Sequence, residues 1–422
     1  MKKRYNYRAY PTAREQERLA RLFGCVRTVY NDALDLYQSA HEAGLQRPST
    51  SVVQSHVVTY AKAHHRPYLA DVALGPLIQA VRDVDRAYKN FFASIAGTRK
   101  GPRIGAPRRK NKFARQSARF MCGRDAVRLT DLGGGKAVVR IPKVGDVRLA
   151  YSRPLPCDPT SVTIVRTKDG VYEVSFVVEV EPVSVEVLHQ RSVGVDLGLD
   201  CFAALVYSDG TREKIANPRH LRAATRRLKR AQRVLSRRQS PDRRTHTKAS
   251  QNWRKQKVKV ARIHASVRNR RTDFHRKQAL ALAGNQTVVV ENLNIAGLAR
   301  SGARNAQGRG LRRSIHDAGW SAFLSVCAAK MGDRLILVDP RFTSQTCSVC
   351  GVLDGPKPLR VRTWTCDCGA RLDRDYNAAV NIMVAAGLAE TQNACGADIR
   401  LALARAVSVE AGTHWSDKGM TA

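Results

Sequence analysis

Acidic residues are scarce in this sequence. The 422 residues include 35 Asp and Glu against 73 Lys and Arg, which leaves a formal net charge of +38. A folded body with this charge repels itself unless a polyanion neutralises it, and nucleic acid is the polyanion that fits best. The other polyanion to consider is a membrane surface.

Long apolar runs are also lacking. The sequence contains no run of the ~18 apolar residues by which a membrane-spanning helix is recognised. Its basic beginning, MKKRYNYRAYPT, is not followed by the apolar segment of a secretory signal. The hydrophobic fraction of 43% is ordinary for a folded protein. We therefore expect a cytoplasmic protein that binds nucleic acid.

Paired cysteines are confined to one short segment. Six of the ten cysteines are scattered singly and are expected to be ordinary packing residues: Cys25, Cys122, Cys157, Cys201, Cys327 and Cys395. The other four form Cys347-Ser-Val-Cys350 and Cys366-Asp-Cys368, each followed by glycine. Two thiolate pairs at this separation predict a structural zinc ribbon. The second pair is shorter than the usual C-x-x-C, so Asp367 is an alternative fourth ligand.

The first half of the chain divides into helical and extended segments. Residues 4–10 alternate like an edge strand, and apolar residues at three- and four-residue spacing predict helices within 12–97. The segment 101–112 interrupts this pattern with glycine, proline and basic residues. Residues 117–182 are typical of β-structure, with a hairpin turn at Lys168-Asp169-Gly170. A new domain is expected near Ser192.

The second half begins with a strand, a turn and a strand within 193–208. Residues 219–277 contain 22 Lys and Arg against two acids, a ratio that indicates two basic helices, broken near Ser240-Pro241, that contact phosphates. A buried strand is expected at 285–291, a mobile Gly- and Arg-rich segment at 296–314, and a helix at 317–332. A strand at 334–339 and a helix at 375–388 follow.

Three acids occupy the ends of predicted elements. Asp196 and Glu291 each end an apolar strand, and Asp375 opens a helix. Because strand ends meet at one edge of a sheet, these carboxylates can converge. Converged carboxylates favour Mg²⁺ or Mn²⁺, and two such ions would support phosphodiester hydrolysis. Asp373 is a rival for the third position, and Asp200 and Asp317 are secondary candidates. Alternatively, each acid is a turn or N-cap residue.

Individual nucleic-acid contacts are predicted from basic and aromatic side chains. On the two basic helices they are Arg226, Arg227, Lys229, Arg230, Arg233, Arg237, Arg238, Arg254 and Lys255. In the first half they are Tyr5, Tyr7, Tyr88, Arg108, Arg109 and Lys110. The tyrosines could stack on bases or read a short DNA motif, although aromatic residues are more often part of a core.

The order of these motifs resembles the transposon-encoded TnpB nucleases and the compact type V CRISPR effectors derived from them. The resemblance covers roughly residues 1–395, and its most specific part is Asp373-Arg-Asp-Tyr-Asn-Ala-Ala-Val-Asn-Ile382. Four further motifs agree: Tyr88-Lys-Asn-Phe-Phe92, Gly105-Ala-Pro-Arg108, Asp317-Ala-Gly-Trp320 and Thr343-Ser-Gln-Thr-Cys347. Trp364-Thr-Cys366 follows in the order that the family requires.

The resemblance implies a multidomain α/β protein with an RNase H-like RuvC core. Its domains would be a wedge strand at 1–11, a helical recognition domain at 12–105, a wedge β-barrel at 106–182, a RuvC nuclease at 192–346, a zinc-ribbon insert that binds target nucleic acid at 347–372 and a RuvC helix at 373–395. The weak pattern of the remaining residues predicts a disordered or loosely docked tail at 396–422. The family's catalytic triad corresponds to Asp196, Glu291 and Asp375, and its zinc ligands to Cys347, Cys350, Cys366 and Cys368.

The resemblance also implies the activity and the partners. A guide RNA, one per protein, would pair with target DNA beside a short motif read by the protein. One RuvC site would then cut both strands, in the prokaryotic cytoplasm. Transposon-borne and CRISPR-borne versions stay equally open. The alternatives are a guide-free RNase H-like nuclease, which needs little beyond 192–395, and a non-catalytic zinc-ribbon protein that binds nucleic acid.

Overall fold

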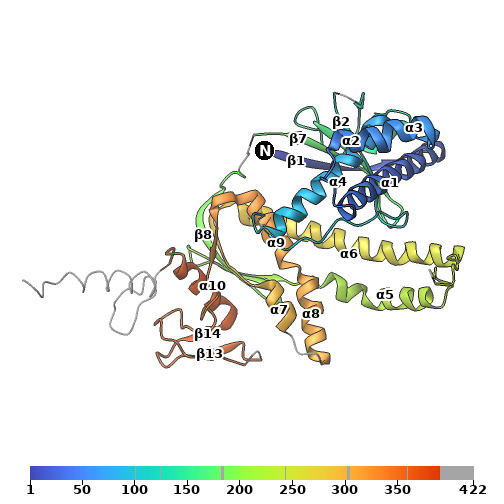
Figure 1. Ribbon diagram of the computed structural model, residues 1–422. Coiled ribbons are helices and arrows are strands. Elements are labelled where there is room, and N and C mark those ends of the chain that lie inside the picture. Colours follow the sequence, from blue (N-terminus) through green and yellow to red (C-terminus); the bar gives the residue numbers. More distant parts are fainter. Residues whose placement is uncertain are drawn as a thin grey trace, which may run out of the picture. The chain divides into compact units, whose positions relative to one another are not determined.

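Two units divide the chain, Met1–Pro182 and Val183–Ala422. The computed structural model describes residues 1–99, 101–123, 125–181, 185–242, 244–301, 305–358 and 360–389 (Figure 1). The tail expected at 396–422 and the end of the helix expected up to 395 lie outside these residues. No helix in the described ranges is long and apolar enough to cross a membrane.

The first unit contains a seven-stranded antiparallel sheet. Its order is β2-β6-β7-β1-β5-β4-β3. The strands are β1 (Lys2–Tyr10), β2 (Gln116–Met121), β3 (Arg128–Gly133), β4 (Lys136–Ile141), β5 (Gly145–Ala150), β6 (Ser161–Arg166) and β7 (Tyr172–Glu179). The hairpin predicted at Lys168-Asp169-Gly170 joins β6 to β7 and is confirmed. In the described residues β2 and β3 do not pair, so strand pairing does not close the expected barrel.

The first strand was expected at an edge, and that prediction is wrong. β1 lies inside the sheet and pairs with β7 along Lys2–Ala9 and with β5 along Arg8–Tyr10. Alternation along β1 therefore sends Tyr7 and Ala9 into the core and leaves Arg8 and Tyr10 exposed. Polar residues on one face made the strand resemble an edge.

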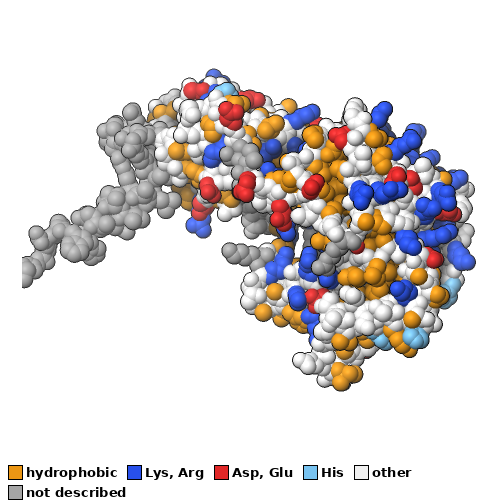
Figure 2. Space-filling model, turned by 90° about the horizontal axis from the view of Figure 1, so that it is seen from above, with side chains coloured by type: hydrophobic (Ala, Val, Ile, Leu, Met, Phe, Trp, Pro, Cys, Tyr) orange, Lys and Arg blue, Asp and Glu red, His pale blue; other side chains and the backbone are white. Residues whose placement is uncertain are grey.

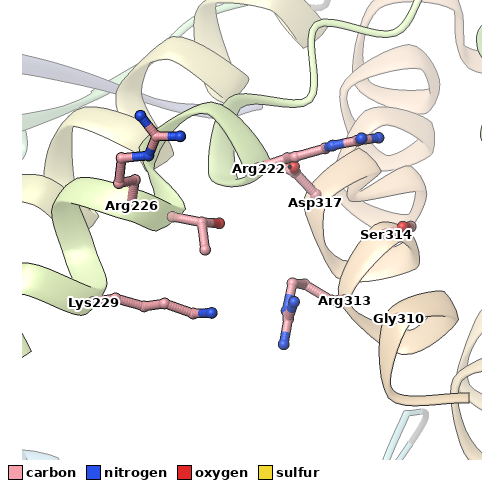
Figure 3. Close-up of a pocket in the computed structure, with 8 residues that line it drawn as sticks. Arg222, Arg226, Lys229, Gly310, Arg313, Ser314 and Asp317 are labelled. Carbon is pink, nitrogen blue, oxygen red and sulfur yellow. Dashed lines mark hydrogen bonds between the residues drawn. The ribbon is translucent and has the colours of Figure 1, made fainter. Parts of the chain in front are cut away.

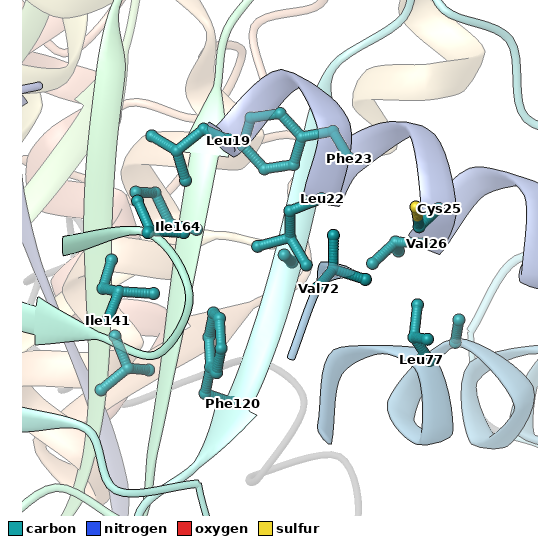
Figure 4. Packing of buried hydrophobic residues seen from close by; sticks show 14 of the residues in the cluster. Leu19, Leu22, Phe23, Cys25, Val26, Val72, Leu77, Phe120, Ile141 and Ile164 are labelled. Carbon is teal, nitrogen blue, oxygen red and sulfur yellow. The ribbon is translucent and has the colours of Figure 1, made fainter. Parts of the chain in front are cut away.

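Helices fill the region between β1 and β2, as expected. They are α1 (Ala13–Glu42), α2 (Thr50–Gln54), the π-helix η1 (Ser55–Tyr60), α3 (Ala61–His64), the 3-10 helix η2 (Pro67–Asp71) and α4 (Leu74–Ile95). The capping box of Thr12 and Glu15 starts α1. Leu19, Leu22 and Val26 of α1 pack with Leu77 of α4 and with sheet residues such as Phe120 (Figure 4).

A five-stranded mixed sheet is the centre of the second unit. Its order is β10-β9-β8-β11-β12, with β9 and β10 antiparallel and β11 and β12 parallel to their neighbours. The strands are β8 (His189–Leu197), β9 (Cys201–Tyr207), β10 (Arg212–Ala216), β11 (Asn285–Glu291) and β12 (Leu335–Val338). The strands expected near 193–208, 285–291 and 334–339 are thus confirmed.

Helices cover both faces of this sheet. Val288 and Val290 pack with Phe323 of α9 (Trp320–Met331) and with the C-terminal half of α6 (Gln251–Ala283). Val289, between them in sequence, packs on the opposite face with Ile382 of α10 (Arg374–Ala385). Burial on both faces explains why β11 is continuously apolar rather than alternating.

The segment expected to be mobile is largely helical. It forms α7 (Ile295–Ser301) and α8 (Ala306–Ala318). The side chain of Asn294 accepts a hydrogen bond from Gly297 N, and that of Asn305 from Gly308 N, both at 2.9 Å. Ile315 and Ala318 anchor α8 in the core. Caps and burial outweigh the glycine content, and Gly319, at φ +67°, separates α8 from α9.

The two basic helices are confirmed as α5 (His220–Ser236) and α6, which lie side by side in Figure 1. The side-chain amide of Gln256 donates to the carbonyl of Ala231 at 2.9 Å, which ties α6 to α5. The segment 347–373 contains the short strands β13 (Thr363–Thr365) and β14 (Arg371–Asp373), which pair with each other.

Candidate active site and cysteine cluster

Asp196 and Glu291 lie side by side on the two central strands. β8 and β11 are parallel, and Val195 is in register with Val290. The next residues of the two strands, Asp196 and Glu291, are therefore neighbours across the sheet. Both acids also point to the α10 face. Gly194, two residues before Asp196, approaches α10 so closely that a Cβ there would lie 2.1 Å from the carbonyl oxygen of Ala379. Val289, two residues before Glu291, packs against Ile382.

Asp375 comes to the same place from α10. The carboxylate of Asp373 caps this helix by accepting from the backbone N–H groups of Asp375 at 3.0 Å and Tyr376 at 3.1 Å. Asp375 is thereby in the first turn, and Ala379 and Ile382, four and seven residues later, face the sheet. Helical periodicity puts Asp375 on that same face. The structure therefore brings the three predicted acids together.

Burial and mutual repulsion set the protonation of this cluster. Burial, followed by the charges of Glu291 and Asp375, raises the pKa of Asp196 to about 8. Burial also raises the pKa of Glu291, while a hydrogen bond from the Thr343 hydroxyl opposes that rise. Both shifts reflect the free-energy cost of keeping these buried, neighbouring carboxylates charged when no cation lies between them.

Two basic side chains that the sequence did not single out contact Asp375. Lys214 Nζ, on β10, lies 3.2 Å from Asp375 Oδ2 and 2.8 Å from Asp373 Oδ2. Arg362 lies 3.6 Å from Asp375 Oδ1 and also pairs with Asp200. Neither residue is adjacent in sequence to the acids that it contacts, so only the fold reveals these contacts.

The rival acids have other roles in the structure. Asp373 is the N-cap of α10, as its position before the helix suggested, and it pairs with Lys214. Asp200 is exposed and pairs with Arg219 and Arg362. Asp317 accepts hydrogen bonds from the backbone N–H groups of Leu221 at 2.7 Å and Arg222 at 2.9 Å, at the start of α5. Asp317 is therefore a helix-capping residue, and its candidacy for the acid cluster is corrected.

The asparagines of the last motif join the acids to the cysteine cluster. Asn377 accepts from Ser348 N at 2.8 Å and donates to the Thr346 carbonyl at 2.8 Å. Asn381, one turn later, donates to the carbonyls of Thr343 and Thr346 at 2.8 and 2.7 Å. Helix α10 thus fixes the segment that carries both the hydroxyl bound to Glu291 and the first cysteine ligand.

The four predicted zinc ligands converge. The sulfur atoms of Cys347, Cys350, Cys366 and Cys368 all lie within 4.8 Å of one another. Two of these separations are 3.8 and 3.7 Å, and a tetrahedral zinc with Zn–S bonds of about 2.3 Å requires about 3.8 Å. The shorter C-x-C pair therefore supplies two thiolates, and Asp367 is not needed. This cluster fits a structural zinc ion.

Asp196, Glu291 and Asp375 differ from the cysteines in the chemistry of their ligand atoms. Asp196 interacts electrostatically with both Glu291 and Asp375. Carboxylate oxygens suit hard cations such as Mg²⁺ and Mn²⁺, whereas thiolates suit zinc.

The basic residues predicted on α5 are exposed, but the predicted contacts in the first unit differ in availability. Tyr7 is 2% exposed, and its hydroxyl donates to the Arg153 carbonyl at 2.9 Å, so its assignment to base stacking is corrected. Tyr5 and Tyr88 are partly buried against the same core. Arg109 pairs with Asp35, and Lys110 Nζ lies 3.7 Å from the centre of the Tyr30 ring. Arg108 is exposed.

Comparison with known sequences identifies the family. A relative from Streptomyces pristinaespiralis named as an RNA-guided DNA endonuclease is 37% identical over 407 residues, which are 95% of this chain and 92% of the relative. The chain belongs to the TnpB family. The endonuclease InsQ of Escherichia coli K12, also named RNA-guided, is 32% identical over 395 residues, 90% of this chain and 91% of the relative.

Family models match three parts of this TnpB-family chain. The OrfB family of IS605, described as a probable transposase, matches residues 175–302, and the Cas12f1-like TNB domain matches 320–382. A helix-turn-helix domain of the OrfB family matches 1–46. Here that stretch forms β1 and the single long helix α1. The first two matches include all three acids and all four cysteines of the sites described above.

Solved structures share the fold of this TnpB-family chain. A Cas12f1 protein in complex with its single guide RNA and target DNA aligns with 14% identity and a TM-score of 0.54, over 90% of this chain and 98% of the other. A mini-RNA-guided endonuclease of the CRISPR-Cas phi type aligns with 11% identity and a TM-score of 0.50, over 92% of each chain. At these identities the likeness concerns the fold.

Proposed function

We propose that this chain is an RNA-guided DNA endonuclease whose single hydrolytic site consists of Asp196, Glu291 and Asp375. The observation that carries the proposal is the convergence of these acids from β8, β11 and α10 on one face of the sheet. The mixed sheet beneath them supports an RNase H-like, RuvC-type core. The names of the full-length relatives support guidance by RNA.

The ligand chemistry of the acids fits Mg²⁺ or Mn²⁺. All donors are carboxylate oxygens, and without a cation the pKa of Asp196 rises to about 8. A bound pair of such ions would supply an activated water and stabilise the leaving oxygen of the phosphodiester. Asp196, Glu291 and Asp375 would hold the ions.

The chain's other residues orient the acids and receive the substrate. The Thr343 hydroxyl holds one oxygen of Glu291, and the Asp373 cap fixes the turn that carries Asp375. Lys214 and Arg362 provide positive charge beside Asp375, where a phosphate would approach. In the proposed complex the exposed basic side chains of α5 contact the guide RNA or its duplex with the target DNA.

Guidance is tested by expressing the protein together with its own flanking DNA. We expect an RNA of defined size to co-purify, and we expect linear duplex DNA to be cut only where it matches this RNA beside a defined flank. Cutting without RNA would support a guide-free nuclease instead. A bound RNA with no cutting of matched DNA would support a protein that only binds.

A further inference from the structure

A basic cleft lies between α5 and α8. It has a volume of about 530 Å³, and its lining includes Arg222, Arg226 and Lys229 from α5 and Arg313 and Ser314 from α8 (Figure 3). Cavities of roughly 300–1,000 Å³ accommodate ligands of nucleotide size or somewhat larger. The carboxylates of the proposed hydrolytic site do not line this cleft.

Positive charge predominates in the cleft, whose lining has four Lys and Arg side chains and the carboxylate of Asp317. In the described part of the chain, none of the four cationic side chains forms an ion pair. Asp317 also lines the cleft, but its two carboxylate oxygens accept from the backbone N–H groups of Leu221 and Arg222. Its charge therefore holds the start of α5 against α8.

The cations face each other across the opening. Figure 3 shows Lys229 of α5 and Arg313 of α8 extending into the same space from opposite walls. Like charges held this way repel each other. An anion between them would attract both cations and offset this repulsion. The guanidinium group of Arg313 can bind two oxygens of one phosphate, and Ser314, the next residue of the helix, also lines the cleft.

We propose that this cleft binds a backbone phosphodiester of a nucleic-acid strand, and so fixes the strand between α5 and α8. The inference rests on the proposed function, because it assigns a defined subsite to the nucleic acid that such an enzyme binds. It differs from a general attraction to the basic surface of α5, since it requires α8 and a particular pair of walls. RNA and DNA strands both carry this ligand.

The test measures binding in the full chain with Asp196→Asn and without divalent cations, so that neither cleavage nor metal binding contributes. Fluorescence anisotropy gives the affinity for labelled single-stranded RNA, single-stranded DNA and an RNA–DNA duplex over a range of salt concentrations. The cleft variant is Lys229→Gln with Arg313→Gln. The matched control is Arg128→Gln with Lys168→Gln, which removes the same two charges from exposed positions outside the two basic helices.

The cleft variant is expected to bind about tenfold more weakly at 0.15 M salt, and the slope of log K against log salt should fall by about 1.4 for two lost contacts to a single strand. The control should lose less than about threefold. If only one of the three nucleic acids loses more affinity in the cleft variant than in the control, that nucleic acid is the one bound in the cleft. If all three lose affinity equally, the phosphate itself is the ligand. Equal losses in both variants, or no loss in the cleft variant, would overturn the proposal.

A second pair of variants leaves every cation in place. A Cβ at Gly310, which also lines the cleft, meets open space. Gly310→Glu puts a carboxylate at the opening, whereas Gly310→Gln adds a neutral side chain of the same size. We expect Glu to weaken binding severalfold more than Gln does. Equal affinity of the two variants would contradict an anion site here, whatever the outcome of the cleavage assays.

Discussion

Asp196 is held in an environment that disfavours its negative charge. Burial and the neighbouring carboxylates raise its pKa to about 8, against ~3.9 in an unfolded chain. Between these values the folded state keeps a proton that the unfolded state releases. The resulting stability is fully present below about pH 4 and is lost as the pH rises to about 8.

The first prediction concerns this titration. Without divalent cations, Asp196→Asn is expected to flatten the pH dependence of stability, because an amide has no proton to lose. Thermal unfolding at pH 5, 6.5 and 8 should show the variant gaining on the wild type as the pH rises, by roughly 2–4 °C for each kcal/mol. Added Mg²⁺ should stabilise the wild type more than the variant. Parallel curves for the two proteins would refute the assignment.

A second prediction at the residue scale concerns Thr343, whose hydroxyl donates to Glu291. Thr343→Val keeps the shape of the side chain and removes the donor, so Glu291 loses its orientation. We expect the Mg²⁺ concentration needed for half-maximal cleavage to rise about 10–100-fold. Thr343→Ser, which retains the hydroxyl, is the control and should stay close to the wild type. An equal rise in both variants would argue against the hydrogen bond as the cause.

At the scale of elements, the sequence predicted the strands that carry Asp196 and Glu291 and the helix that carries Asp375. Apolar runs ending in an acid are local signals, and parallel strand ends meet by geometry. Lys214 and Arg362 could not be predicted, since their contacts with Asp375 span 161 residues in one case and depend on the cysteine segment in the other. The capping role of Asp317 was hidden because its partners precede it by about 95 residues.

Two elements were misjudged for identifiable reasons. The strand predicted at 4–10 was expected at an edge because one of its faces is polar, but pairing on both sides cannot be recognised from alternation alone. The helices within 295–318 were missed because glycine and arginine suggested mobility. Their stability comes from asparagine caps and from the burial of Ile315, which becomes visible only in the folded unit.

The cysteine cluster gives a prediction at the same scale. Cys366→Ser removes one ligand of a closed tetrahedral site, and zinc binding contributes folding free energy to this segment. We expect bound zinc to fall from one ion per chain toward none, together with a lower melting temperature. Elemental analysis and thermal unfolding measure both. Cys157→Ser, at an exposed position outside the cluster, should change neither. Full zinc content in Cys366→Ser would contradict four-thiolate ligation.

At the scale of the whole molecule, the net charge of +38 is the property that the sequence reveals most directly. Lys and Arg side chains are spread over the face seen in Figure 2. Net charge alone indicates a polyanionic partner. It does not identify which nucleic-acid strand binds to which part of the protein surface. The domain ranges inferred from the family resemblance stay predictions. The transposon-borne and CRISPR-borne origins stay equally open.

The central claim is that one site cuts both strands of the target. It is tested most directly by Mg²⁺-dependent cleavage of a guide-matched duplex labelled on each strand, with wild type, Asp196→Asn, Glu291→Gln and Asp375→Asn. Asp333→Asn, at an exposed position outside both sites, is the control. We predict that each of the three substitutions slows cutting of both strands by at least about a thousandfold, while the control cuts normally. Continued cutting of either strand in Asp196→Asn would contradict the single site.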